Sequence, residues 1–175
     1  MKLDFNAIAQ GYAVDVICDF LDKKGVKNYL VEIGGEVRCK GVNSKGIFWR
    51  VGIDKPVDNL LYDRELQDIV QLENRALATS GNYRKYFEEN GIKYSHTINP
   101  KTGYPEKSNL LSASVIAVDC ITADAFATAF MVMGLEKSYE FVKNNKTMEA
   151  YFIYADDKGE FKVKATEGFM KYLVD

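Results

Sequence analysis

A chain of 175 residues is long enough for one domain, and its hydrophobic share of 47% is ordinary for a protein with a packed core. The formal net charge is −2, and Lys and Arg are scattered among Asp and Glu, which argues against a nucleic-acid-binding protein or a charge-steered membrane surface. No apolar run approaches the ~20 residues of a membrane span, and no apolar signal core follows Met1. We therefore expect neither a nucleic-acid partner nor a membrane span in this chain.

Residues 7–24 are predicted to form a helix, because apolar side chains recur at three- and four-residue steps along them. The predicted apolar face consists of Ile8, Tyr12, Ala13, Val16, Ile17, Phe20 and Leu21. Asn6 is a residue type that caps helix N-termini, and Gly25 is one that ends helices. The sequence therefore predicts a first helix bounded by these two residues.

The rest of the chain is predicted to consist mostly of strands, with helices in separate blocks. Alternating patterns bounded by Gly, Pro and Asn predict strands at 29–33, 36–41, 48–54, 68–73, 76–80, 83–88, 92–98, 111–118, 150–154 and 160–164. Asn90-Gly91 predicts a hairpin turn, and helices are predicted at 122–133 and 136–144. This order favours an α+β fold with a mostly antiparallel sheet and packed helices.

The three cysteines are Cys18, Cys39 and Cys120, and they are too far apart to form a CxxC pair. This spacing argues against a zinc site. We expect buried or free thiols.

Asp124 and Thr128 lie four residues apart in a predicted helix, so their side chains share one face. Two oxygen ligands on one helical turn suit a hard cation such as Mg²⁺. The simpler explanation is also open, because an Asp in a first helical turn offsets the helix dipole and a helical Thr often bonds to a backbone carbonyl.

His96 is the only histidine, and it precedes the turn-rich segment 99–105. Histidine titrates near neutrality, so His96 is a candidate proton acceptor, although a lone histidine is more often a surface or core residue.

Small-residue segments at 34–36, 78–83 and 102–105 allow close backbone approach to a phosphate or an aromatic ring, or are simple turns. Neither a Rossmann fingerprint nor a P-loop is present.

The order of these segments resembles that of the ApbE-type FAD:protein FMN transferases. The matching stretches are 4–15 (DFNAIAQGYAVD), 32–36 (EIGGE), 49–53 (WRVGI) with Pro56, 76–83 (ALATSGNY), 96–105 (HTINPKTGYP) and 123–129 (ADAFATA). They resemble the family patterns D-x-G-[AG]-I-A-K-G-Y-A-x-D, N-x-G-G-[DE], W-x-V-G-I-x-x-P, A-[LV]-A-T-S-G-[DN]-Y, H-I-[IL]-[DN]-P-x-T-G-x-P and A-D-A-[LW]-[SA]-T-A. The resemblance covers most of the chain and implies a single domain over 1–175 with an ApbE or T-fold-like α+β fold.

The resemblance implies a site as well. Mg²⁺ is expected at the Ala7 carbonyl, Asp124 and Thr128, and His96 is our candidate for the base that deprotonates the acceptor hydroxyl. The resemblance and the small-residue loops together give the expected FAD contacts as Asp4, Gln10, Thr79, Ser80, Gly81, His96, Ile98, Thr102 and Gly103. Two positions depart from the family pattern, because Gln10 stands where Lys is usual and Asn6 where Gly is usual.

The implied reaction is Mg²⁺-dependent transfer of FMN from FAD to a Thr or Ser hydroxyl of a partner flavoprotein, with release of AMP. The alternatives are a relative that binds or hydrolyses FAD without transferring FMN, and a non-enzymatic domain that keeps only the fold. Family members have a long portion before the first motif, and are periplasmic or membrane-anchored lipoproteins. We therefore expect the same compartment for a full-length form, and weak FAD binding by this chain alone.

Overall fold

The computed structural model describes residues 4–56, 65–81, 86–89, 92–95, 103–104 and 108–174. Its main feature is an antiparallel six-stranded sheet in the order β1-β2-β5-β8-β9-β10. The bounds of these strands are β1 (Tyr29–Ile33), β2 (Glu36–Lys40), β5 (Ala76–Gly81), β8 (Leu110–Ala117), β9 (Glu149–Ala155) and β10 (Phe161–Ala165).

Two smaller sheets complete the β structure of the described residues. One is three-stranded, in the order β11-β4-β3, and consists of β3 (Trp49–Asp54), β4 (Leu66–Leu72) and β11 (Leu173–Val174). The other is the hairpin of β6 (Tyr86–Glu89) and β7 (Ile92–Ser95), which pair antiparallel as the Asn-Gly turn signal predicts.

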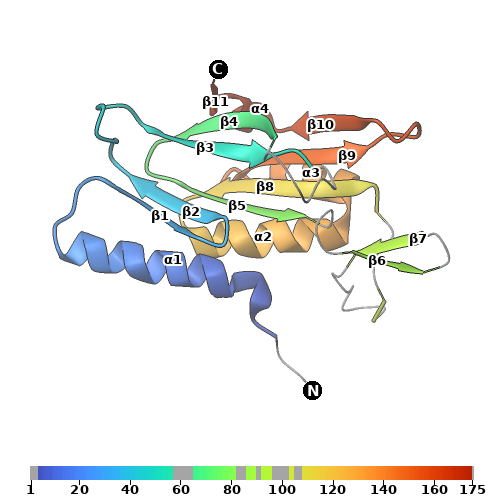
Figure 1. Ribbon diagram of the computed structural model, residues 1–175, viewed down its shortest axis with the longest axis horizontal. Coiled ribbons are helices and arrows are strands. Elements are labelled where there is room, and N and C mark those ends of the chain that lie inside the picture. The colour runs from blue at the N-terminus through green and yellow to red at the C-terminus, as the bar shows by residue number, and fades with distance from the viewer. Residues whose placement is uncertain are drawn as a thin grey trace.

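The helices and the small sheet cover opposite faces of the large sheet (Figure 1). Helices α1 (Asn6–Lys23), α2 (Cys120–Met133) and α3 (Leu135–Lys143) lie on one face, and α4 (Glu167–Met170) lies with the three-stranded sheet on the other. Each face has its own core: Val14, Val115, Ala127, Phe130 and Phe152 on the helical side, and Ile53, Val70, Leu77, Ile116, Tyr151 and Phe169 on the other. The result is a three-layer molecule in which strands present alternate residues to the two cores.

The predicted α+β class and antiparallel sheet are confirmed, as are the expected buried free thiols. The elements α4 and β11 were not predicted from the sequence, because each is too short to show a hydrophobic period. No helix among the described residues is long and apolar enough to cross a membrane.

The predicted apolar face of α1 is wrong for four of its seven residues, although Leu21 packs against the helical-side core as expected. Tyr12, Val16, Ile17 and Phe20 are all exposed, by 59%, 48%, 40% and 57%. The buried residues are instead Gly11, Val14, Asp15 and Cys18. The inner face carries Gly11 and Asp15 beside Val14 and Cys18, because α1 packs closely against α2 and uses a carboxylate as a tertiary contact.

The predicted start of α1 is also corrected. Asn6 is the first helical residue and Phe5 is the N-cap, which makes no side-chain capping bond. Asp4 takes over that role, because its carboxylate accepts a hydrogen bond from the Asn6 amide at 2.8 Å. The predicted stop at Gly25 is confirmed: Gly25 has a φ of 78°, and its amide donates to the Asp22 carbonyl at 2.9 Å.

The close approach of α1 to α2 depends on Gly11. A Cβ atom at this position would lie 2.5 Å from the Cys120 carbonyl oxygen and 2.8 Å from the Asp124 Cβ. Both neighbours are fixed parts of α2, so the two helices would have to separate. We therefore expect Gly11→Ala to lower the free energy of unfolding by about 1–3 kcal/mol, measured by denaturant unfolding.

The matched control is Ala9→Ser, at an exposed position of the same helix. It should change the free energy of unfolding by no more than about 0.5 kcal/mol. A Gly11→Ala protein as stable as the control would show that the helix contact is looser than described.

Candidate active site

Helices α1 and α2 are held together by two carboxylates. Asp15 of α1 accepts hydrogen bonds from the α2 amides of Cys120, at 3.0 Å, and Ile121, at 2.8 Å. It also pairs with the Arg38 guanidinium of β2 at 2.7 Å. Asp15 therefore acts as an N-cap supplied by another helix, and Asp119 caps the same helix locally through the Thr122 amide.

Asp124 makes the reverse contact, from α2 to α1. Its Oδ2 accepts a hydrogen bond from the Gly11 amide at 2.9 Å, and the side chain is buried. Burial raises the pKa of Asp124, and the bond from Gly11 opposes that rise. The carboxylate is thus fixed at the helix crossing rather than free to reach solvent.

The Ala7 carbonyl lies near the same point. In an α-helix the amide of residue 11 faces the carbonyl of residue 7 at about 3 Å. Since that amide also donates to Asp124, ideal helix geometry leads us to expect the Asp124 Oδ2 and the Ala7 oxygen within about 6 Å of each other. This spacing is compatible with a shared ion. Ala7, Asp124 and Thr128 remain a predicted set of metal ligands.

Thr128 lies one turn after Asp124, and its hydroxyl is 3.0 Å from the Ser80 hydroxyl of β5. Ser80 therefore faces the helices. Thr79 faces the opposite side of the sheet, where its hydroxyl is 2.7 Å from that of Ser114. The two residues, predicted as neighbouring FAD contacts, are thus separated by the sheet except where β5 ends, at Gly81.

A cleft of about 370 Å³ opens on the Thr79 side, between the large sheet and the three-stranded sheet. Its apolar lining includes Leu30, Val37 and Leu77, and Arg50 and Asp54 are among its polar residues. The sequence did not indicate this cleft, because its walls come from strands that are distant along the chain.

Glu36, the first residue of β2 and the last of the EIGGE segment, is a buried ionisable residue that the sequence pattern did not single out. It is 6% exposed, and its Oε2 has no hydrogen-bond partner among the described residues. Burial, and then the charge of Asp124, raise its pKa to about 7. A Cβ atom on Gly34 would lie 1.9 Å from Gln10 Nε2 and 3.3 Å from Glu36 Oε2, so both side chains border this glycine.

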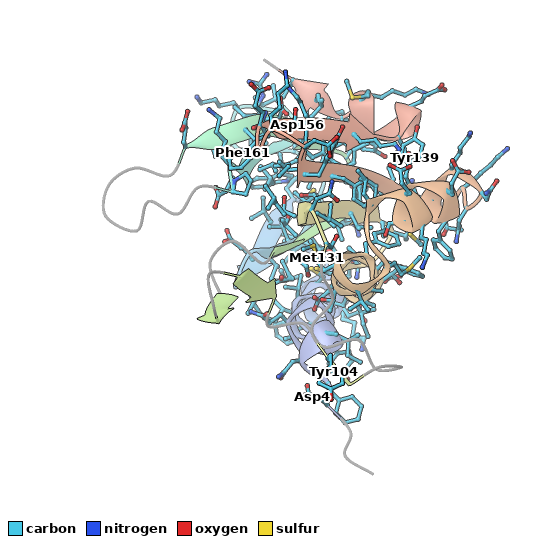
Figure 2. All side chains as sticks on the ribbon, turned by 90° about the vertical axis from the view of Figure 1, so that its right-hand side faces the viewer. Asp4, Tyr104, Met131, Tyr139, Asp156 and Phe161 are labelled. Carbon is cyan, nitrogen blue, oxygen red and sulfur yellow. The ribbon has the colours of Figure 1, made fainter. Side chains whose placement is uncertain are left out.

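The remaining predicted residues are less closely tied to this region. Asp4 lies beyond the start of α1, at one end of the molecule (Figure 2). Gly103 is exposed with a φ of 76°. His96, Ile98 and Thr102 lie outside the described residues.

The described part of the chain contains no cluster of three or more His, Cys, Asp or Glu side chains suited to a metal. A cation at Asp124 would therefore depend on carbonyl, hydroxyl and substrate oxygens.

Comparisons with known proteins agree on one family. A family model described as the ApbE family matches residues 1–152. The chain is 42% identical over 174 residues to an FAD:protein FMN transferase of Vibrio cholerae, covering 99% of this chain and 50% of that protein. It is 36% identical over 174 residues to the Escherichia coli K12 protein of the same name, covering 99% of this chain and 48% of that one. The chain thus spans about half the length of these curated relatives.

Solved structures give the same result. A flavin transferase ApbE from Vibrio cholerae superposes with a TM-score of 0.83 at 40% identity, covering 98% of this chain and 52% of that one. A Thermotoga maritima ApbE protein superposes with a TM-score of 0.80 at 30% identity, covering 99% of this chain and 54% of that one. The chain therefore shares the overall fold of these solved ApbE structures.

The Glu36 carboxyl should make stability depend on pH. Its pKa is about 7 in the folded chain and near 4.5 when unfolded, so the folded state holds the proton more tightly. Its contribution is fully present below pH 4.5 and is lost as the pH rises through 7. We expect Glu36→Gln, which cannot ionise, to become more stable than the parent chain by up to about 3 kcal/mol between pH 5 and pH 8.

The measurement is denaturant unfolding of both proteins across that pH range, without metal. Asp124 shifts in the same direction and its charge acts on Glu36, so the difference between parent and variant reports the loss of the Glu36 charge together with its effect on Asp124. A difference that does not change with pH would contradict the raised pKa of the buried Glu36 carboxyl.

Proposed function

Because the chain belongs to the ApbE family, we propose that it carries the transfer chemistry of an FAD:protein FMN transferase, moving FMN from FAD to a Thr or Ser hydroxyl of a partner flavoprotein. The observation that carries the proposal is the helix crossing, where Asp124 of α2 meets the Gly11 amide of α1 and Thr128 meets Ser80. A buried carboxylate, two hydroxyls and a nearby helix carbonyl form an oxygen-rich corner suited to a hard cation and a pyrophosphate.

In the proposed reaction the acceptor hydroxyl oxygen forms a bond to the FMN-side phosphorus of FAD. The bond from that phosphorus to the bridging oxygen breaks, and AMP leaves with the bridging oxygen. The hydroxyl proton passes to a base, for which His96 is our candidate. FMN remains on the acceptor as a phosphodiester, so the step needs no oxidant or reductant.

The residues of this chain supply position and charge, which is the main protein contribution to such transfers. Asp124, Thr128 and the Ala7 carbonyl would hold Mg²⁺, which when bound offsets negative charge on the pyrophosphate and the departing AMP. Ser80 contacts Thr128 directly and would orient its hydroxyl. Proposed FAD contacts are Asp4, Gln10, Thr79, Ser80, Gly81, His96, Ile98, Thr102 and Gly103.

The end of β5 explains how one ligand could use both faces of the sheet. Ser80 faces the helices and Thr79 faces the cleft, and the strand ends at Gly81. FAD is long enough to pass this edge, with its pyrophosphate at the helix crossing and another part on the cleft side. Gly81 would allow the close backbone approach that such a path requires.

The test is FMN transfer from FAD to a Thr-containing acceptor protein, followed by flavin fluorescence of the acceptor and by AMP release. Asp124→Asn keeps an oxygen that can accept from the Gly11 amide but removes the charge, so the fold should persist. We expect its transfer rate to fall about 100-fold or more, and chelation of Mg²⁺ to abolish transfer by the parent chain.

The control is Asp157→Asn, an exposed residue of the turn between β9 and β10, which should transfer within about twofold of the parent rate. Equal rates for Asp124→Asn and the control would contradict the proposed site. Release of AMP and free FMN without labelled acceptor would instead favour the FAD-hydrolysing alternative.

A further inference from the structure

The β2 strand presents a row of charged residues to α1, and within the described part of the chain Glu36, its first member, is the one without an ion-pair partner. Arg38 pairs with Asp15 at 2.7 Å, and Lys40 pairs with Asp22 at 2.7 Å. Glu36 lies on the same face of the strand, since it alternates with these two residues. Its Oε2 is buried and has no hydrogen-bond partner among the described residues.

The surroundings of Glu36 offer no compensating cation in the described part of the chain. The ion pairs found there do not include Glu36 or Asp124, although each of these carboxyls is buried and Asp124 acts electrostatically on Glu36. The amide nitrogen of Gln10 is close by but carries no charge. Two buried acidic groups with no positive partner are unfavourable, unless a proton or an external cation joins them.

A cation is the occupant that also fits the proposed substrate. A pyrophosphate alone would be repelled by two carboxylates, whereas a divalent ion attracts both. We propose that Glu36 is a second acidic residue of the divalent-cation site at Asp124, facing the ion from β2 while Asp124 and Thr128 face it from α2. This inference rests on the proposed function, and it extends the site to a residue on a different element.

Glu36 acts here as a positioning residue. Divalent ions of the Mg²⁺ type keep several water ligands, and carboxylates around such an ion commonly accept hydrogen bonds from those waters. The unpartnered Oε2 provides such an acceptor. The Gln10 side-chain amide, which borders the same glycine, Gly34, can donate to an oxygen of the substrate.

The experiment measures Mn²⁺ binding by electron paramagnetic resonance, with the parent chain and its variants, first with Mn²⁺ alone and then with FAD present. Glu36→Gln should weaken Mn²⁺ binding at least about tenfold, the usual effect of losing an outer-shell partner. The matched control is Glu73→Gln, an exposed glutamate of the turn between β4 and β5, which should stay within about twofold of the parent. Glu36→Asp, which keeps the charge, should recover part of the affinity.

The outcomes separate this inference from the proposed function. Weakened binding in Asp124→Asn together with unchanged binding in Glu36→Gln overturns the role of Glu36 and leaves the metal site standing. Equal losses in Glu36→Gln and Glu73→Gln also overturn it, because general surface charge would then explain both. No Mn²⁺ binding by the parent chain, with or without FAD, overturns the proposed metal site and this inference together.

Circular dichroism and denaturant unfolding of each variant provide the check on folding. A Glu36→Gln protein that is folded but weak in Mn²⁺ binding supports the inference. In FMN transfer it should need more Mn²⁺ for half-maximal rate, while the rate at saturating Mn²⁺ stays close to that of the parent. A lower saturating rate with unchanged Mn²⁺ dependence would contradict a positioning role through the ion.

Discussion

The Asp15 carboxylate is the contact on which the arrangement of the candidate site depends. It joins three elements, because it accepts from the Cys120 and Ile121 amides of α2 and pairs with Arg38 of β2 while belonging to α1. A carboxylate at a helix N-terminus satisfies backbone donors and complements the helix dipole. Once α2 is held there, Asp124 falls one turn further along, opposite the Gly11 amide.

This constraint explains why hydrophobic periodicity misassigned α1. Periodicity locates large apolar residues, and on α1 these are Tyr12, Val16 and Phe20, which are exposed. The inner face is instead occupied by Gly11, which allows close approach, and by Asp15, whose burial is compensated by hydrogen bonds. Strands, hairpins and the Gly25 stop could be predicted because they depend on local turn chemistry and alternation. Tertiary capping depends on residues more than a hundred positions apart, which no local pattern contains.

The same distinction applies to the site. Asp124 and Thr128 could be predicted together, since helical spacing puts both on one face. Thr79 and Ser80 are adjacent in sequence, and strand alternation sends them to opposite faces. Glu36 became distinctive only in the fold, where its burial and its missing partner could be seen. Glu36 gives the site its chemical character. The carboxyls of Glu36 and Asp124 are both buried, and no ion pair among the described residues includes either of them. This arrangement favours a cation that binds together with the substrate.

The most direct measurement is a crystal structure of the chain with FAD and Mn²⁺, using the anomalous signal of manganese to locate the ion. The account predicts an anomalous peak bonded to the Asp124 carboxylate and the Thr128 hydroxyl, at ligand distances near the ~2.1 Å of Mg²⁺ sites, with the FAD pyrophosphate beside it. A peak on another part of the molecule, or a pyrophosphate bound away from the crossing of α1 and α2, would contradict the account.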